Sequence, residues 1–165
     1  SFWIPGLPGD SAVTDENGTT FATPANTVAS ANTYGDELLH TKIRINADGG
    51  WPSMCLRVKN QYETYGTNTS YMVFFNKGNI NVQKFVLGSR RVFESGAGAK
   101  CDFEYNKEYD LMIGAVNHED NVEIIVCLDG QPVLRFRDYD EDRITEEGYI
   151  QVYARSGSIS LLKTK

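Results

Sequence analysis

The sequence predicts an all-β protein with essentially no helix, built as a two-sheet antiparallel β-sandwich. Short apolar or alternating segments recur at spacings of about 8 to 15 residues and are separated by turns rich in Gly, Asn and Asp. No segment repeats apolar residues at helical spacing over about ten residues. We therefore expect about ten to thirteen short strands, arranged as a sandwich rather than as a closed barrel.

Residues 1–31 are expected to be largely irregular and to pack on a single domain that spans residues 1–165. The segment is rich in proline and glycine, which interrupt strand pairing. One edge strand is expected at residues 19–22. The sequence begins abruptly at Ser1 and stops at Lys165, which is expected of a module excised from a larger protein, with processing of the N-terminus as the alternative explanation of the start.

The first regular strands are predicted at residues 38–46 and 54–58. Both alternate apolar and polar residues with a period of two, which is typical of a half-buried strand. The turn at residues 47–50 lies between them, so the two strands are expected to pair antiparallel. The long polar loop that follows, residues 60–70, has a length that often accompanies function.

The middle of the chain predicts a hairpin of residues 71–75 and 80–87. The first of these strands is apolar at nearly every position, which indicates a central strand covered on both faces or an outer face that supports something else. A further strand is expected at residues 90–94, where Arg90 and Arg91 are interpreted as a solvated pair. Residues 95–99 are expected to form a flexible loop.

The last part of the chain predicts five strands with short connections. Residues 109–116 form one strand, and residues 122–128 and 133–136 form a hairpin around the turn Asp129-Gly130. The acidic loop at residues 138–142 follows. The final strands are expected at residues 149–154 and 159–162.

Composition excludes several classes of function. The formal charge of −6 argues against a nucleic-acid partner, which requires a basic surface. No apolar run reaches the roughly 18 residues of a membrane span. The three cysteines, Cys55, Cys101 and Cys127, have no metal-ligand spacing and are interpreted as buried free thiols, with a Cys55–Cys101 bridge as the alternative.

The sequence contains no recognisable catalytic motif. It lacks a strand-borne pair of carboxylates in the E-x-D-x-x-E pattern, a G-x-S-x-G turn and a second ligand beside His40 or His118. The acidic residues allow two interpretations, a solvated turn or a structural calcium site. Calcium carboxylates would come from the series Asp138, Asp140 and Asp142, or from the N-terminal Asp10, Asp15 and Glu16.

Several motifs together resemble the concanavalin A-like, or laminin G-like, superfamily of jelly-roll sandwiches. The motifs are Ser70 to Phe75 followed by 80–85, Tyr109-Asp110-Leu111, Leu128-Asp129-Gly130, the acidic loop from Asp138, Gly148-Tyr149-Ile150 and Gly157 before the last strand. The resemblance covers residues 37–165. Within the superfamily, the sequence is most similar in character to bacterial extracellular carbohydrate-binding modules such as family 66. It implies sugar binding, an extracellular or cell-surface location and a monomeric module within a multidomain protein.

Aromatic and amide side chains are the candidate ligand-binding residues, because sugar rings stack on aromatic rings and sugar hydroxyls bond to amides and guanidinium groups. These candidates are Trp51, Arg57, Tyr62, Tyr65, Asn81, Gln83, Gln151 and Tyr153, with Tyr34, Asn79 and Arg155 as further members. If their strands are neighbours in one sheet, their polar faces form one platform. The sequence thus predicts a non-catalytic carbohydrate-binding module, with a glycoside-processing enzyme or a laminin G-like protein-binding domain as alternatives.

Overall fold

The computed structural model describes residues 3–5, 13–22, 28–46, 52–76, 78–93, 96–154 and 158–162. These residues form strands, turns and loops, and none of them forms a helix, let alone one that could span a membrane. The strands are β1 (Trp3–Pro5), β2 (Val13–Asp15), β3 (Gly18–Ala22), β4 (Val28–Ser30), β5 (Leu38–Ile45), β6 (Ser53–Val58), β7 (Ser70–Asn76), β8 (Asn79–Val86), β9 (Ser89–Arg91), β10 (Gly98–Lys100), β11 (Glu108–Asn117), β12 (Val122–Leu128), β13 (Gln131–Asp138), β14 (Tyr149–Tyr153) and β15 (Ser158–Leu162).

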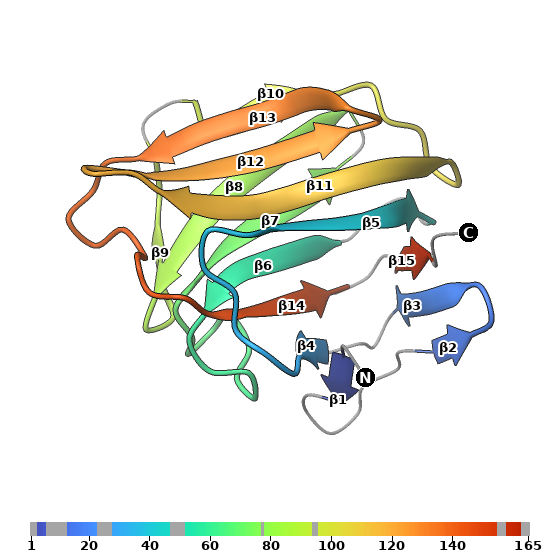
Figure 1. The fold of residues 1–165 in the computed structure, drawn as a ribbon, viewed down its shortest axis with the longest axis horizontal. Coiled ribbons are helices and arrows are strands. Elements are labelled where there is room, and N and C mark those ends of the chain that lie inside the picture. Colours follow the sequence, from blue (N-terminus) through green and yellow to red (C-terminus); the bar gives the residue numbers. More distant parts are fainter. Residues whose placement is uncertain are drawn as a thin grey trace.

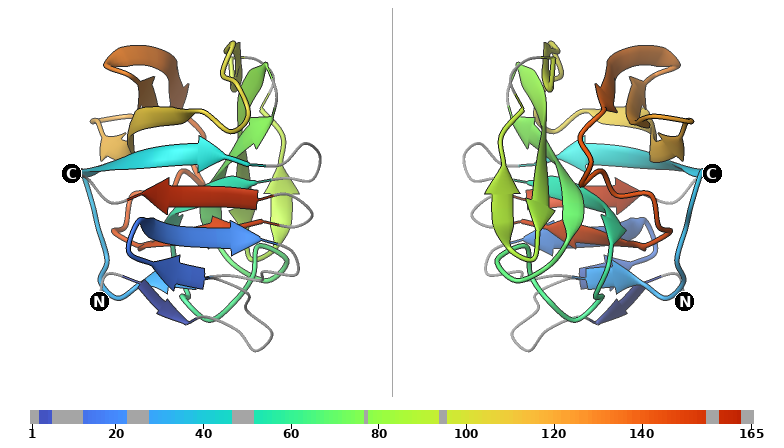
Figure 2. Two further views of the ribbon diagram at one scale, coloured as in Figure 1. Left: turned by 90° about the vertical axis from the view of Figure 1, so that its right-hand side faces the viewer. Right: turned by 90° about the vertical axis from the view of Figure 1, so that its left-hand side faces the viewer.

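Two antiparallel sheets pack face to face (Figures 1 and 2). Sheet A has the order β1-β4-β14-β6-β7-β8-β10, with β9 paired to β8. Sheet B has the order β13-β12-β11-β5-β15-β3-β2 and faces the viewer in Figure 1. The predicted β-sandwich is therefore confirmed.

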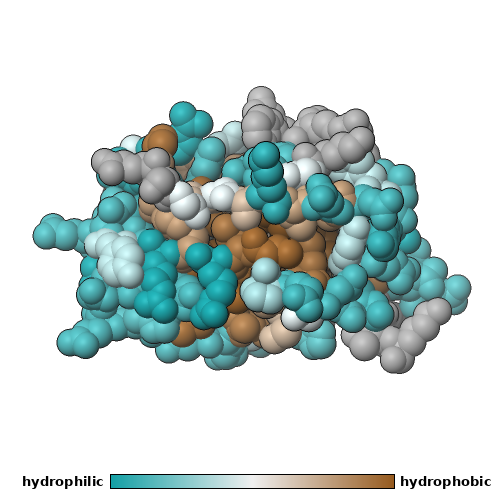
Figure 3. All heavy atoms as spheres, turned by 90° about the horizontal axis from the view of Figure 1, so that it is seen from above, coloured by the Kyte–Doolittle hydropathy of each residue, from teal (hydrophilic) through white to brown (hydrophobic). Residues whose placement is uncertain are grey.

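The main core lies between the two sheets. Each sheet contributes the apolar residues that point inward from alternate positions of its strands, such as Ile43 and Ile113 from sheet B and Met54, Val73 and Ile80 from sheet A. Seen from the edge formed by β10 and β13, apolar side chains gather in the middle of the surface between polar margins (Figure 3).

The predicted pairing of residues 38–46 with residues 54–58 is wrong. β5 pairs with β11 and β15 in sheet B, whereas β6 pairs with β7 and β14 in sheet A. The inward rows of both strands belong to the core between the sheets. Alternation along a strand therefore predicts correctly which face is buried, but it does not determine which sheet the strand joins.

The N-terminal segment is more regular than predicted, because it contributes strands to both sheets. β1 and β4 extend sheet A beyond β14, and β2 and β3 extend sheet B beyond β15. β3 has a partner on each side and is not the predicted edge strand. Residues 98 and 99 of the predicted flexible loop likewise belong to β10. These strands are only a few residues long and are held by backbone pairing. They are therefore too short to show a clear alternation of apolar and polar residues in the sequence.

All three cysteines are free, so the alternative of a Cys55–Cys101 bridge is wrong. Cys55 is buried, and Cys101 and Cys127 are partly buried. Burial raises the pKa of the Cys55 thiol to about 12. Cys55 is therefore a neutral, unreactive thiol at physiological pH.

Candidate ligand-binding site on the outer face of sheet A

Four neighbouring strands of sheet A, β14, β6, β7 and β8, present two rows of side chains on the face turned away from sheet B. The strand registers give the rows as Tyr153–Ser53–Phe74–Asn81 and Gln151–Cys55–Met72–Gln83. The strands that carry the predicted residues Asn81, Gln83, Gln151 and Tyr153 are thus joined in one sheet. This face lies on the far side in Figure 1 and on the right in the left view of Figure 2.

A pocket of about 240 Å³ lies on this face. Its described lining, hereafter the aromatic pocket, consists of Tyr65, Met72, Phe74, Gln83, Phe85, Arg90 and Tyr153. The three apolar residues from β7 and β8 form a cluster with Cys55 and Val58, separate from the main core. The pocket therefore has an apolar base on the sheet and polar groups beside it.

Aromatic rings from two distant parts of the chain meet at this pocket. The ring of Tyr65, on the loop that precedes β7, lies 5.4 Å from the ring of Tyr153 in an edge-on arrangement. The same ring lies 5.2 Å from that of Phe85. These are favourable centroid distances for aromatic pairs, so the three rings support one another.

The loop of residues 60–69 is fixed over the sheet by two buried amides. The Asn68 Nδ2 donates to the backbone oxygens of Asn60 at 2.6 Å and Glu63 at 2.9 Å. From the sheet below, the Gln151 Nε2 donates to the same Glu63 oxygen at 2.9 Å. Gln151 is only 2% exposed. Gln151, which was predicted to contact the ligand, instead holds the loop that carries Tyr65.

The turn between β8 and β9 contacts the same loop. Leu87 and Gly88 both have positive φ angles, 49° and 82°, as a two-residue type I′ hairpin requires. The Gly88 N–H donates to the Asn68 backbone oxygen at 2.8 Å, and the Leu87 N–H donates to Thr69 Oγ1 at 3.0 Å. The turn sets the register in which Arg90 lies opposite Phe85.

Arg57 is not on the outer face, because β6 contains a bulge at this residue. Its φ is 55°, and the register against β14 shifts between Gln151, opposite Cys55, and Tyr149, opposite Val58. An extra residue on one strand reverses the alternation beyond it. Arg57 is therefore buried, and the prediction that it belongs to an outward polar face is wrong.

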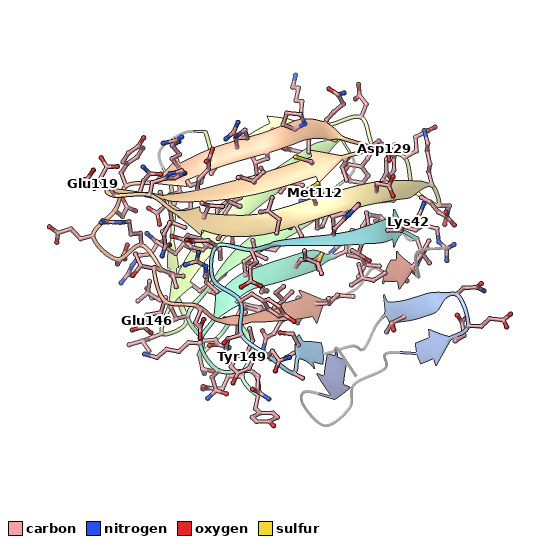
Figure 4. All side chains as sticks on the ribbon, in the orientation of Figure 1. Lys42, Met112, Glu119, Asp129, Glu146 and Tyr149 are labelled. Atoms are coloured by element: carbon pink, nitrogen blue, oxygen red, sulfur yellow. The ribbon has the colours of Figure 1, made fainter. Side chains whose placement is uncertain are left out.

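Both Nη atoms of the Arg57 guanidinium donate hydrogen bonds to oxygen atoms of the protein. Nη1 donates to Asn117 Oδ1 at 2.9 Å and to the Thr145 oxygen at 3.0 Å, while Nη2 donates to the Ala115 oxygen at 2.9 Å and to Asp36 Oδ1 at 3.2 Å. Burial lowers the pKa of this guanidinium, and Asp36 acts in the opposite direction. Arg57 therefore links sheet A to sheet B and to the loop before β14. Figure 4 labels Glu146 in this loop and Tyr149 at the start of β14.

Two other aromatic candidates, Tyr62 and Tyr34, lie apart from the pocket. Tyr62 is on the same loop as Tyr65 but is 55% exposed and does not line the pocket. Tyr34 is bridged to Gly148 and packs against the main core. Trp51 and Arg155 lie outside the described residues.

The acidic loop surrounds an internal ammonium group. Lys84 Nζ lies 2.9 Å from Asp138 Oδ2, 3.0 Å from Asp140 Oδ2 and 2.5 Å from Asp142 Oδ1. The side chains of Lys84 and Asp138 are fully buried. Among the described residues no cluster of His, Cys, Asp or Glu is arranged to hold a metal ion. The three carboxylates proposed for calcium are therefore already engaged by Lys84.

On the outer face of sheet B, charged side chains pair with one another. Glu123 bonds to Arg135 Nε at 3.0 Å, and Lys42 pairs with Asp110 at 3.5 Å. Met112 is 37% exposed near the middle of this face (Figure 4). In the aromatic pocket, by contrast, the side chains of Gln83 and Arg90 have no hydrogen-bond or ion-pair partner among the described residues.

Sequence reasoning did not select Met72, Phe74, Phe85 and Arg90 as site residues. The continuous apolar run of residues 71–75 was the available signal, because a strand with one face in the core needs a second apolar face only if something covers it. The sequence offers no comparable signal for Arg90, which differs from Arg91 only in the side of β9 on which it lies.

The comparisons with known proteins agree with this architecture. No family model and no curated protein matches the sequence. The carbohydrate-binding module CBM66 from Bacillus subtilis superposes with a TM-score of 0.68 at 16% identity, covering 98% of this chain and 92% of the module. A legume lectin-like domain from Entamoeba histolytica gives 0.63 at 12% identity, covering 97% and 86%.

An enzyme shares the fold as well. The beta-glucanase of Bacillus licheniformis superposes with a TM-score of 0.60 at 10% identity, covering 99% of this chain and 75% of the enzyme. Identities at this level establish the architecture and not the activity. The chain therefore has the concanavalin A-like β-sandwich fold, which sugar-binding domains and a glucanase share with it.

Proposed function

We propose that this protein is a non-catalytic carbohydrate-binding module that takes part of a polysaccharide or oligosaccharide into the aromatic pocket. The observation that supports it best is the meeting of Tyr65 and Tyr153 above an apolar base, beside the uncommitted polar groups of Gln83 and Arg90. The structural likeness to a carbohydrate-binding module and a lectin-like domain favours the same class of ligand.

The chemistry of the lining suits a sugar ring. The C–H face of a pyranose or furanose packs on tyrosine and phenylalanine rings, while its hydroxyls bond to amide and guanidinium groups. The pocket of about 240 Å³ is close to the lower limit of ligand pockets, about 300 Å³, so it accommodates about one sugar unit. Neighbouring units would extend over the outer face of sheet A toward Asn81.

Binding is favoured over hydrolysis because the described lining contains neither Asp nor Glu. Glycosidases of this architecture require two carboxyl groups on either side of the scissile bond. The cluster of Lys84 with the acidic loop does not supply them, because those carboxylates contact its ammonium.

Alanine substitutions on one loop and one strand test the proposal. Tyr65→Ala and Tyr153→Ala are each expected to weaken binding to the best glycan of an array by about tenfold, as loss of an aromatic contact implies. Isothermal titration calorimetry measures the affinity, and circular dichroism checks that the variants are folded.

Tyr62→Ala is the matched control, because Tyr62 lies on the same loop and outside the pocket. It is expected to leave the affinity unchanged. Equal affinity of the wild type and Tyr153→Ala would contradict the proposal, as would binding to a protein ligand with no binding to any glycan.

A further inference from the structure

We infer that the sugar taken by the aromatic pocket is acidic and that Arg90 binds its carboxylate. This inference rests on the proposed function and specifies the class of sugar. Arg90 is the one charged side chain in the described lining of the pocket. An arginine offers parallel N–H donors that match a planar carboxylate, such as that of a uronic acid.

The two arginines of β9 have different environments. Arg91 points to the side of the acidic loop, where Nε donates to Asp142 Oδ2 at 3.0 Å and Nη1 donates to Ser89 Oγ at 2.8 Å. Arg90 points to the opposite side, is exposed, and has no hydrogen-bond or ion-pair partner among the described residues. Its guanidinium is thus available to a ligand, whereas that of Arg91 is already neutralised by a carboxylate.

The backbone that carries Arg90 is held in place relative to the rest of the pocket. Arg90 lies directly opposite Phe85, a residue of the apolar base, across the β8–β9 pair. The type I′ turn between these strands is bonded to Asn68 and Thr69, in the loop that also carries Tyr65. The aromatic wall, the apolar base and the backbone of Arg90 therefore have fixed relative positions before any ligand arrives, which reduces the entropy lost on binding.

Gln83 provides a second polar contact on the same face. It lies two positions before Phe85 on β8, lines the pocket, and its amide has no partner among the described residues. An amide N–H beside a guanidinium can bond to a carboxylate oxygen or to an adjacent ring hydroxyl. A neutral sugar would leave the charge of Arg90 in water, so it gains less from this site than an acidic sugar does.

The net charge of −6 does not oppose such a ligand at physiological salt. Exposed charges are largely screened beyond about 8 Å at this ionic strength, so the charges nearest to the ligand dominate. On the other side of β9, the carboxylate of Asp142 is paired with both Lys84 and Arg91. Local attraction to Arg90 therefore decides the preference.

A glycan array gives the first test. It would carry oligosaccharides of galacturonic, glucuronic and mannuronic acid, the same oligosaccharides after reduction of each carboxyl to a primary alcohol, and sulfated and neutral glycans. We expect the strongest signals from carboxylated probes and a loss of about tenfold on reduction. Preference for neutral or sulfated glycans would overturn the inference but leave the proposed function intact, whereas no glycan binding would overturn both.

Two arginine variants give the second test, with calorimetry on the strongest carboxylated probe and its reduced form. Arg90→Gln is expected to weaken binding of the acidic probe by about tenfold and to change the reduced probe by less than about twofold. Arg91→Gln removes the same charge from the other side of β9 and is expected to leave the affinity for both probes within about twofold. An equal loss for both probes in Arg90→Gln, or an equal loss in both variants, would contradict a direct contact.

Discussion

Lys84 is a charged residue whose burial depends on other charged residues. Its side chain is fully buried, and its ammonium contacts three carboxylates, of which only that of Asp138 is also fully buried. Asp138 in turn accepts a hydrogen bond of 2.7 Å from the Tyr71 hydroxyl, which also accepts one from the Ile144 N–H. This network joins β7, β8 and the acidic loop, so it links both sheets at one end of the sandwich.

Replacing Lys84 with methionine is expected to destabilise the protein by about 3–5 kcal/mol, because it leaves the buried carboxylate of Asp138 without a counter-charge. Urea unfolding followed by tryptophan fluorescence measures the change. The substitution retains the length of the aliphatic chain, so lost packing contributes little.

The double variant Lys84→Met/Asp138→Asn separates the charge effect from other effects. Because the amide carries no charge to leave unpaired, the double variant is expected to recover part of the lost stability. A double variant whose loss equals the sum of the two single losses would show that the two residues do not interact in this way.

Individual site residues were predictable from the sequence where alternation is regular. Gln83 ends the alternating sequence of residues 79–83 and Tyr153 ends that of residues 149–153, and the structure places both in the aromatic pocket. Arg57 follows the same pattern in the sequence, but the bulge turns it inward. Nothing in the residue types around it marks that bulge, because its cause is the pairing with β14, about ninety residues later in the chain.

At the scale of elements, the aromatic pocket depends on contact between a loop and a hairpin turn. A Cβ added to Gly88 would lie 2.1 Å from the Gly66 oxygen, so the turn and the loop approach each other closely only because Gly88 has no side chain. Gly88 also has a φ of 82°, which L-residues rarely adopt.

Gly88→Ala is therefore expected to push the β8–β9 turn away from the loop. Backbone strain at this φ is about 1–2 kcal/mol, and the collision with Gly66 is expected to add about 1–3 kcal/mol. The affinity for glycans should fall together with the stability, because Tyr65 and Arg90 lie on the two separated elements. Urea unfolding and calorimetry measure the two effects.

Gly130→Ala is the matched control for this prediction. Gly130 occupies the same position of a type I′ turn, with a φ of 78°, but a Cβ there meets nothing within 4 Å. It is expected to show the backbone strain alone and normal glycan affinity. Equal destabilisation in the two variants would show that the contact with Gly66 is unimportant.

Most elements were predictable, whereas their partners were not. The hairpin of β12 and β13 follows from Asp129-Gly130 between two apolar runs, a local signal that contains both strands and their turn. The separation of β5 and β6 into different sheets depends on which strands pair with their edges. β6 pairs with β7 and β14, whereas β5 pairs with β11 and β15. That pairing involves the whole chain and leaves no mark in residues 38–58.

For the molecule as a whole, paired carboxylates make stability depend on pH. Hydrogen bonds from Lys84 lower the pKa of Asp142 below its usual value of 3.8, and burial only partly opposes this. Burial raises the pKa of Glu123, but the hydrogen bonds with His118 and Arg135 outweigh burial and hold the pKa below its usual value of 4.5. Each group thus contributes stability above its usual pKa and loses that contribution as the pH falls through its folded-state pKa.

The free energy of unfolding is therefore expected to decline as the pH falls below about 4. In Asp142→Asn the decline should be shallower, since the amide does not titrate in either state. Urea unfolding at a series of pH values between about 2 and 6 measures the slopes. Identical slopes for the wild type and the variant would show that Asp142 does not contribute.

The positions of β14 and β15 determine when this chain can finish folding. β14 separates β4 from β6 and β15 separates β3 from β5, so the N-terminal pairs β1–β4 and β2–β3 cannot join the rest of either sheet until residues 149–162 are present. Thr20 and Ser160, which bond across β3 and β15, are 140 residues apart in the sequence. During synthesis on the ribosome, β4 and β3 therefore each keep one edge unpaired until residues 149–162 have emerged, and in that interval these edges are open to pairing with other molecules.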